Sequence, residues 1–198
     1  MRAEPYVCGL VLAAGGSSRL GRPKQLLPYR GATLLDWVLG TARACAFDQI
    51  VVALGGAAGD VRERVDLGGA DVVVNDAYGD GCSSSIAAAL AALHPRCDVL
   101  VLLLGDQPGV TPATVRALLA GRGEAPLAVC RYDDGRGHPL AFGRSVFGQL
   151  AELHGDKGVW KLLDRHGAAV AEVAVPEVAP LDVDTPDDYA AALAAAEA

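Results

Sequence analysis

Short apolar runs alternate with segments of helical periodicity along this chain. Several of the apolar runs are continuous stretches of Val and Leu, which is typical of strands that are covered on both faces. The runs predicted to form strands are Tyr6–Leu12, Gln49–Leu54, Asp71–Val74, Asp98–Leu104, Leu127–Cys130 and Val170–Val175. The segments predicted to form helices are Leu34–Cys45, Asp60–Val65, Ser84–Leu93, Pro112–Ala120, Ser145–Glu152, Lys157–Asp164 and Asp187–Ala196.

The order of these elements predicts an α/β fold. Strands that alternate with helices favour a mostly parallel sheet with helices on both faces. Thr111 before Pro112, and Thr185 before Pro186, predict helix N-caps with proline at the first helical position. No internal repeat or long linker divides the sequence, so residues 1–198 are expected to form a single domain.

Composition and charge exclude several classes of partner. The chain has 17 Lys and Arg residues against 24 Asp and Glu residues, a net charge of −7, which argues against binding to nucleic acid or to an anionic membrane surface. The apolar run 99–104 is far shorter than the roughly twenty residues of a membrane span. Residues 6–14 are apolar enough for a signal-peptide core, but a Gly/Ser/Arg loop follows them directly. Five scattered cysteines without a CxxC pair fit reduced thiols, and we expect a cytoplasmic protein.

The segment after the first predicted strand favours an anion-binding loop over a flexible surface loop. It follows Leu12 and has the sequence Ala-Ala-Gly-Gly-Ser-Ser-Arg-Leu-Gly-Arg-Pro-Lys, ending at Lys24. Small residues let backbone N–H groups approach a phosphate chain, and Arg19 and Lys24 add positive charge. The Walker A pattern fails because Arg22 and Pro23 stand where Lys and Ser/Thr belong. The dinucleotide pattern GxGxxG is absent as well.

Two acidic segments are candidate sites for a divalent cation. Asp106 follows the strand 98–104 at its exit, where it is either a hard oxygen ligand for Mg²⁺ or the cap of a turn. Asp182 and Asp184 flank Val183, so in an extended chain their side chains share one face. The same segment is also typical of a helix N-terminus. We expect at least one metal ligand from this pair.

Three further segments carry polar groups with two interpretations each. The run from Gly81 to Ser85 opens a helix, and its hydroxyls either contact a nucleotide or simply cap the helix. Cys82 in this run is disfavoured as a nucleophile because no His lies nearby in the sequence. Residues 136–139, between two predicted strands, and residues 155–158, before a helix, either reach over the site or form ordinary turns.

Together these motifs resemble the nucleotidyltransferases of the molybdenum-cofactor family over nearly the whole chain. The first loop is similar to the family's signature loop, and Gly105-Asp106-Gln107-Pro108 is similar to its metal-binding strand exit. The guanylyltransferase branch usually has Leu-Ala-Gly-Gly where this chain has Leu-Ala-Ala-Gly. The segments that resemble the cytidylyltransferase branch are Gly81-Cys82-Ser83-Ser84-Ser85 (with Cys82 in place of Met), Gly137-His138-Pro139, Gly155-Asp156-Lys157-Gly158 and Asp182-Val183-Asp184-Thr185-Pro186.

The resemblance implies a Rossmann-like three-layer α/β/α nucleotidyltransferase fold. It implies transfer of CMP from CTP to the phosphate of molybdenum-molybdopterin, with release of pyrophosphate and with Mg²⁺ as cofactor. It also implies a molybdopterin-type acceptor, and a molybdoenzyme or its maturation factor as a partner.

The resemblance also assigns roles to particular residues. The catalytic residues that it implies are Arg19, Lys24 and Asp106, and the metal ligands are Asp106, Asp182 and Asp184. The nucleotide-binding residues are Leu12, Ala13, Ala14, Gly15, Gly16, Ser18, Arg19, Lys24, Gly81, Ser83 and Ser84. The acceptor contacts are Arg136, His138 and Lys157.

The sequence leaves other functions open. The acceptor is alternatively a sugar phosphate or an isoprenoid phosphate, or the reaction is guanylyl transfer to the same cofactor. A non-catalytic carrier of the molybdenum cofactor would keep the fold, but it has no need of the charged set Arg19, Lys24, Asp106 and Asp184. An NAD(P)-linked oxidoreductase is disfavoured because GxGxxG is missing.

Overall fold

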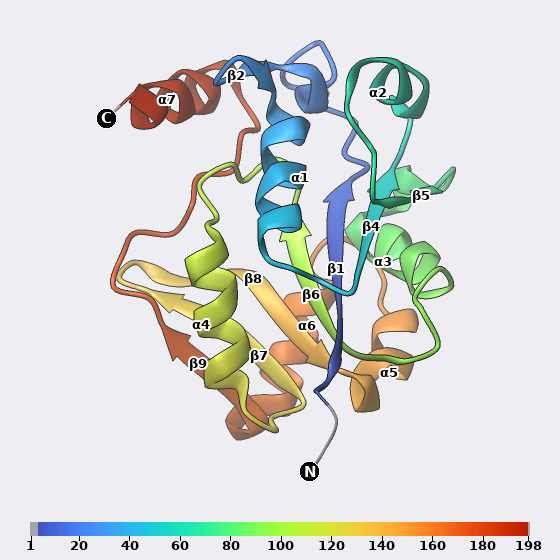
Figure 1. Cartoon of the computed structure of the whole chain (residues 1–198), viewed down its shortest axis with the longest axis vertical. Coiled ribbons are helices and arrows are strands. Elements are labelled where there is room, and N and C mark those ends of the chain that lie inside the picture. The colour runs from blue at the N-terminus through green and yellow to red at the C-terminus, as the bar shows by residue number, and fades with distance from the viewer. Residues whose placement is uncertain (1–3, 198) are drawn as a thin grey trace.

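The computed structural model describes residues 4–197 and places one large sheet at the centre of the molecule (Figure 1). The strands of this sheet are β1 (Tyr6–Ala13), β4 (Gln49–Leu54), β5 (Asp71–Val74), β6 (Cys97–Leu104), β7 (Leu127–Tyr132), β8 (Gly135–Gly143) and β9 (Val170–Ala174). These seven strands lie in the order β5-β4-β1-β6-β8-β7-β9. A separate two-stranded ribbon pairs β2 (Pro28–Tyr29) with β3 (Ala32–Thr33).

The strand β8 is absent from the sequence-based prediction. It runs antiparallel to its neighbours β6 and β7, whereas the other neighbouring strands of the sheet pair in parallel. Residues 136–139, expected to form a loop or a turn, lie within β8. Glycine and proline are depleted in strands, and β8 begins with residues of both types. The local sequence therefore did not predict a strand here, although the strand continues into the buried residues 140–142. The prediction of a mostly parallel sheet is confirmed.

Helices cover both faces of the sheet, as the alternating pattern predicts. One face carries α1 (Leu34–Ala44), α2 (Ala58–Arg64) and α4 (Pro112–Arg122). The other face carries α3 (Cys82–Leu90), α5 (Phe147–Ala151) and α6 (Gly158–His166), and Figure 1 shows this set behind the sheet. Within residues 4–197, no helix combines the length and the apolar character needed to cross a bilayer.

The strand β6 shows why both faces of the sheet need cover. Val99, Val101 and Leu103 pack in the core on the α1 and α4 side, while Leu100 and Leu102 pack in the core on the other side. None of these five side chains is more than 3% exposed. Alternate side chains of a strand point to opposite faces, so a continuous apolar run requires an apolar layer on each side.

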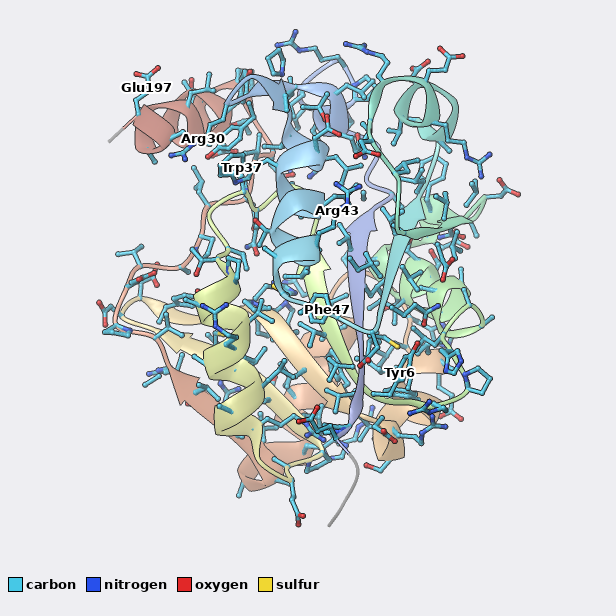
Figure 2. The ribbon with its side chains drawn as sticks, viewed as in Figure 1. Tyr6, Arg30, Trp37, Arg43, Phe47 and Glu197 are labelled. Atoms are coloured by element: carbon cyan, nitrogen blue, oxygen red, sulfur yellow. The ribbon has the colours of Figure 1, made fainter. Side chains whose placement is uncertain are left out.

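The C-terminal helix α7 (Pro186–Glu197) packs on the β2-β3 ribbon in a smaller third core. The Arg30 guanidinium lies 4.8 Å from the Trp37 ring centroid and donates a hydrogen bond to the Ala196 carbonyl (Figure 2). Val183, just before α7, is fully buried in the same core. Its N–H donates to the Asp106 carbonyl at 3.0 Å, which ties the segment before α7 to the end of β6.

Both predicted N-caps are confirmed. The Thr111 hydroxyl accepts a hydrogen bond from the Thr114 N–H at 3.1 Å, with Pro112 at the first position of α4. The Thr185 hydroxyl accepts from the Asp188 N–H at 3.2 Å, and the Asp188 carboxylate accepts from the Thr185 N–H in return. This reciprocal pair stabilises the start of α7 directly after Asp184.

Candidate active site

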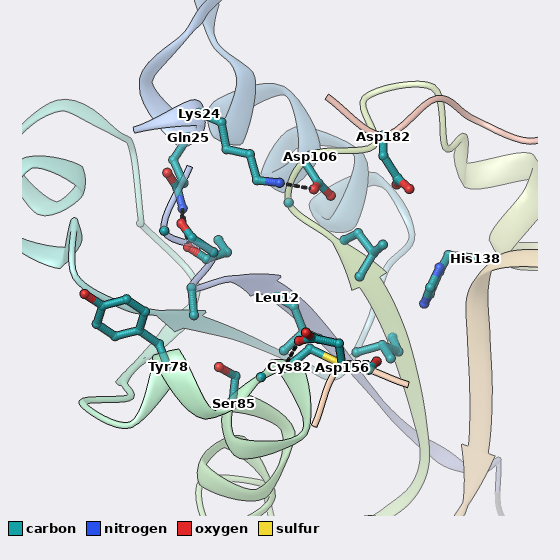
Figure 3. Close-up of a pocket in the computed structure, with 18 of the residues that line it drawn as sticks. Leu12, Lys24, Gln25, Tyr78, Cys82, Ser85, Asp106, His138, Asp156 and Asp182 are labelled. Atoms are coloured by element: carbon teal, nitrogen blue, oxygen red, sulfur yellow. Dashed lines mark hydrogen bonds and ion pairs between the residues drawn. The ribbon is translucent and has the colours of Figure 1, made fainter. Parts of the chain in front are cut away.

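Side chains from several distant segments meet around a cavity at the carboxyl ends of β1 and β6. The cavity has a volume of about 670 Å³, and Figure 3 shows many of the residues that line it. Its walls come from the loop after β1, the start of α3, the carboxyl end of β6, the strand β8 and the segment around the start of α6. In open α/β sheets this edge is where ligands bind, so the cavity is the candidate active site.

Lys24 lies at the centre of a charged cluster on one wall of the cavity. Its Nζ donates hydrogen bonds to Asp106 Oδ2, marked in Figure 3, and to Asp184 Oδ1 at 2.8 Å. Arg19 Nη2 donates to the other oxygen of Asp184, Oδ2, at 2.7 Å. Two cations from the first loop and two carboxylates from later segments therefore converge, although Lys24 and Asp184 are 160 positions apart.

The ion pairs set the protonation states of this cluster. Burial opposes the charge on Lys24, but the negative charges of Asp106 and Asp184 outweigh it and raise the pKa of the ammonium group. The hydrogen bond from Lys24, with the charge of Arg19, lowers the pKa of Asp184. Near neutral pH Lys24 is therefore positively charged and Asp184 negatively charged.

Asp182 completes a set of three carboxylates whose chemistry fits a divalent cation. It lines the cavity, and its pKa is raised by burial and by the negative charge of Asp106. Carboxylate oxygens are the hard donors that Mg²⁺ and Mn²⁺ prefer. Among residues 4–197 no three acidic, His or Cys side chains are spaced to hold an ion as they stand. Here the Lys24 ammonium bonds Asp106 and Asp184 instead.

The loop after β1 is held in shape by its own side chains. The buried Gln25 amide donates from Nε2 to the Ala13 carbonyl at 2.6 Å and to the Gly15 carbonyl at 3.2 Å. The Ser17 hydroxyl accepts from the Lys24 N–H at 2.9 Å. These hydrogen bonds join the two ends of the loop and fix its backbone. Gly15, Gly16 and Ser18 of this loop line the cavity. Such small residues allow a phosphate chain to approach the backbone.

The Gly81–Ser85 run and the segment before α6 form one interlocked unit. The Ser83 hydroxyl donates to the Gly155 carbonyl at 2.5 Å, and the Cys82 N–H donates to Asp156 Oδ1 at 3.0 Å. The carboxylate of Asp156 thus caps the start of α3, where the helix dipole favours a negative charge. Burial and the nearby Asp156 raise the pKa of the Cys82 thiol, which keeps it protonated near neutral pH and agrees with the prediction that disfavours Cys82 as a nucleophile.

Ser85, rather than Ser83 or Ser84, faces the cavity. The buried side chain of Asn75 donates from Nδ2 to the Ser85 hydroxyl at 2.9 Å and to the Ser84 hydroxyl at 2.8 Å. Ser84 also donates to the carbonyl of Ala77 at 2.9 Å. The hydroxyls of Ser83 and Ser84 therefore join structural elements, and of the three serines only Ser85, itself almost fully buried, lines the cavity.

Gly81→Ala is expected to lower the free energy of unfolding by about 1–3 kcal/mol. Gly81 has φ +101°, and an added Cβ would lie 2.7 Å from the Gly155 carbonyl carbon. The matched control is Gly79→Ala, because a Cβ there meets nothing within 4 Å. Urea unfolding followed by circular dichroism measures both variants. Equal stability losses in the two variants would show that the close approach of the two segments is unimportant.

The three predicted acceptor contacts lie in different environments. His138 lines the cavity from β8. Arg136 is not in its lining, and its guanidinium bonds Glu172 Oε1 from Nε at 2.7 Å, with Asp164 at 3.4 Å. Lys157 is exposed just before α6 and is not in the lining either. Of the three, only His138 faces the cavity in this arrangement.

The cavity also contains residues that the sequence analysis did not select. Of the predicted nucleotide-binding residues, all but Arg19, Ser83 and Ser84 line it. Arg19 instead pairs with Asp184 on an exposed side. The lining residues outside the predicted catalytic, nucleotide-binding, metal and acceptor sets are Gln25, Tyr78, Gly79, Cys82, Ser85, Leu102, Leu104, Gly105, Asp156, Val159 and Trp160. Gln25 directly follows Lys24 in the sequence, so its place beside the first loop could have been predicted. Nothing in the sequence around Tyr78 or Trp160 indicates that these aromatic residues line a cavity.

Comparisons with known proteins support a common architecture. Residues 9–170 match the MobA-like NTP transferase domain. The crystal structure of Rv0371c from Mycobacterium tuberculosis H37Rv is 52% identical, with a TM-score of 0.91, and the match covers 97% of this chain and 100% of that one. A structure of Rv0371c in complex with manganese is 51% identical with a TM-score of 0.86, covering 96% and 98%.

Two curated proteins are also similar in sequence. Nicotine blue oxidoreductase from Paenarthrobacter nicotinovorans is 36% identical over 163 residues, which covers 78% of this chain and 79% of that protein. Molybdenum cofactor cytidylyltransferase from Escherichia coli K12 is 27% identical over 183 residues, covering 91% and 92%. One of these relatives is named as an oxidoreductase and the other as a cytidylyltransferase, so the similarity in sequence does not distinguish the two kinds of reaction.

Proposed function

The chain belongs to the MobA-like NTP transferase family, and we propose that it transfers CMP from CTP to the phosphate of molybdenum-molybdopterin. The products are the cytosine dinucleotide form of the cofactor and pyrophosphate. The observation that carries the proposal is the Lys24 ammonium held between Asp106 and Asp184 at the carboxyl edge of the sheet. A cation and several carboxylates beside a glycine-rich loop suit a nucleoside triphosphate with its divalent ion.

The reaction requires alignment and charge neutralisation rather than a general base. A phosphate monoester is largely ionised near neutral pH and attacks the α-phosphorus without losing a proton to the protein. His138 is the one histidine in the described lining, and it lies on β8, away from the loop that we assign to the triphosphate. In our proposal the loop N–H groups and Lys24 hold the phosphates, and Lys24 and Arg19 balance the charge that moves to the departing pyrophosphate.

We assign the divalent ion, Mg²⁺, to Asp106, Asp182 and Asp184. When bound, this ion would supply positive charge that neutralises the phosphates of the nucleotide. The relative crystallised with manganese supports a divalent cation in this family. Val183, buried between the two later carboxylates, fixes the backbone from which both project.

The choice of CTP as nucleotide and of a molybdopterin-type acceptor has its own support. Similarity to molybdenum cofactor cytidylyltransferase over 91% of the chain and the Leu12-Ala13-Ala14-Gly15 loop support CTP and a molybdopterin-type acceptor. Of the three acceptor contacts expected from sequence, we retain His138, which lines the cavity. The similarity to nicotine blue oxidoreductase favours a second candidate, a redox reaction. Hydride transfer has no use for the Lys24 and carboxylate cluster, so we rank it lower.

A pyrophosphate-release assay tests the proposal. Purified protein is given Mg²⁺ and one of CTP, GTP, UTP or ATP, with and without molybdenum-loaded molybdopterin, and mass spectrometry identifies the product. We expect release with CTP that depends on the acceptor. Release with GTP alone among the nucleotides would indicate the guanylyl reaction, and the absence of release with every nucleotide would contradict a transferase.

Lys24→Met is expected to bind free Mn²⁺ about tenfold more tightly than the unmodified chain does. Without nucleotide, the Lys24 ammonium holds the oxygens of Asp106 and Asp184 that the ion would need. Titration followed by electron paramagnetic resonance of unbound Mn²⁺ measures the affinity, with Lys161→Met, on an exposed face of α6, as control. Weaker or unchanged binding would remove these carboxylates from the metal site.

The cellular setting is a further part of the proposal. Residues 1–198 act as one nucleotidyltransferase domain in the cytoplasm, where the product passes to a molybdoenzyme or its maturation factor. All five cysteines are free, and three of them, Cys8, Cys97 and Cys130, are buried. Reduced thiols of this kind fit a reducing compartment.

A further inference from the structure

One end of the cavity is formed by an aromatic pair from two separate elements. His138 comes from β8 and Trp160 from α6, and their ring centroids are 5.4 Å apart with the planes at 79°. Leu102 and Leu104 of β6 and Val159 of α6 line the cavity as well. Figure 3 shows His138 and Tyr78 at opposite ends of the cavity. Leu102 lies opposite Leu140 across β6 and β8, which places the end of β6 beside His138, so the His138 end of the cavity carries aromatic and aliphatic side chains.

The imidazole of His138 is available to a ligand. Within residues 4–197 its ring nitrogens have no hydrogen-bond partner, although its backbone carbonyl accepts a bond of 2.7 Å from the Tyr132 hydroxyl. That bond fixes the backbone and leaves the ring to the cavity. Burial lowers the pKa of His138 to about 4, so near pH 7 the ring is neutral and has one donor nitrogen and one acceptor nitrogen.

The triphosphate is expected at the other end of the cavity. Gly15 and Gly16, with the cation of Lys24, belong to the loop after β1 and line the cavity. Tyr78 and Ser85 lie on the same side of Asp106 as this loop (Figure 3). In a phosphoryl transfer the attacking oxygen and the leaving group stand roughly in line on opposite sides of the phosphorus. A nucleotide bound through the loop therefore leaves the His138 and Trp160 end for the attacking molecule.

We propose that the His138–Trp160 compartment is a subsite for a flat, fused-ring heterocycle on the acceptor, whose phosphate arm extends toward Asp106. The aliphatic side chains Leu102, Leu104 and Val159 contact the faces of the ring system, Trp160 packs against it, and the imidazole bonds a donor–acceptor edge. This inference rests on the proposed transferase function and adds Trp160 as a residue that selects the acceptor. A sugar phosphate has no aromatic face and does not fill this compartment.

The test uses 6-hydroxymethylpterin, without nucleotide or metal, as the probe. The chain has two tryptophans, so a Trp37→Phe variant leaves Trp160 as the sole source of tryptophan fluorescence. We expect the probe to quench that fluorescence saturably, and glucosamine 1-phosphate to have no effect. Should Trp37→Phe fail to fold, the intrinsic fluorescence anisotropy of the probe reports the same binding to the unmodified chain.

Variants of the pair decide the assignment. Trp160→Leu and His138→Leu are expected to weaken probe binding about tenfold, while Trp160→Phe retains most of it and His138→Gln more than His138→Leu. With the complete reaction, Trp160→Leu is expected to raise KM for the acceptor and leave KM for CTP unchanged. Absent quenching, equal binding by all variants, or competition by the sugar phosphate would overturn the subsite.

The outcomes separate the subsite from the proposed function. Because the probe experiment contains no nucleotide, pterin binding that depends on Trp160 establishes the subsite even if pyrophosphate release fails with all four nucleotides. Conversely, CTP-dependent release without any effect of Trp160→Leu on probe binding or on the acceptor KM would keep the transferase and reject the subsite.

Discussion

Asp106→Asn is expected to reduce CMP transfer by about 10²–10³-fold, the loss typical of removing one group that stabilises transition-state charge. Asp106 follows the central strand β6 directly after Gly105, its side chain is only 15% exposed, and it accepts a hydrogen bond from the Lys24 ammonium. The amide keeps the shape of the carboxylate but not its negative charge. It therefore binds a divalent ion weakly and leaves the Lys24 charge less well balanced.

The measurement is pyrophosphate release at saturating CTP and Mg²⁺, with circular dichroism to confirm that the variant folds. Asp98→Asn is the matched control, because Asp98 lies at the other end of the same strand and its side chain is 54% exposed. We expect the control to retain activity. Near-normal turnover of Asp106→Asn with Mg²⁺ would remove Asp106 from the role of metal ligand.

Lys24→Ala is expected to lower kcat by about 10²-fold, with a smaller change in KM for CTP. The Lys24 side chain is 13% exposed and carries a pKa raised by Asp106 and Asp184, so it is a fixed positive charge near neutral pH. If its contact strengthens as negative charge moves to pyrophosphate, its removal affects the transition state more than the bound substrate.

Steady-state kinetics over a range of CTP concentrations separates the two effects. Lys161→Ala is the control, since this exposed lysine on α6 contributes the same charge to the protein outside the cavity. An increase in KM alone would assign Lys24 to ground-state binding. The Lys24→Met titration with Mn²⁺ supplies an independent measure of the same cluster.

The location of the site was predictable because it follows from the strands. Six of the seven strands of the main sheet are apolar runs that local pattern identifies, and the loops at their carboxyl ends hold Lys24 and Asp106. The seventh, β8, begins with glycine, charge and proline, and its pairing with β6 and β7 stabilises it despite a weak local preference. Because β8 was not predicted, the position of His138 on the cavity wall could not be predicted either.

The serines at the start of α3 show a second limit of motif analysis. Ser83, Ser84 and Ser85 are equivalent in sequence, but successive helix residues point about 100° apart, and only the third faces the cavity. Arg136 shows the same limit, because its pairing with Glu172 depends on β8 and β9 lying on either side of β7.

Sequence alone determined the α/β class, the two caps at Thr111 and Thr185, and the charged groups available for chemistry, because each depends on neighbours within one strand or helix turn. Only the tertiary structure brought Lys24 to Asp106 and Asp184, 82 and 160 positions away, and placed His138 beside Trp160. The order of strands in the sheet decides such long-range contacts, and that order results from the packing of all layers together rather than from any local periodicity.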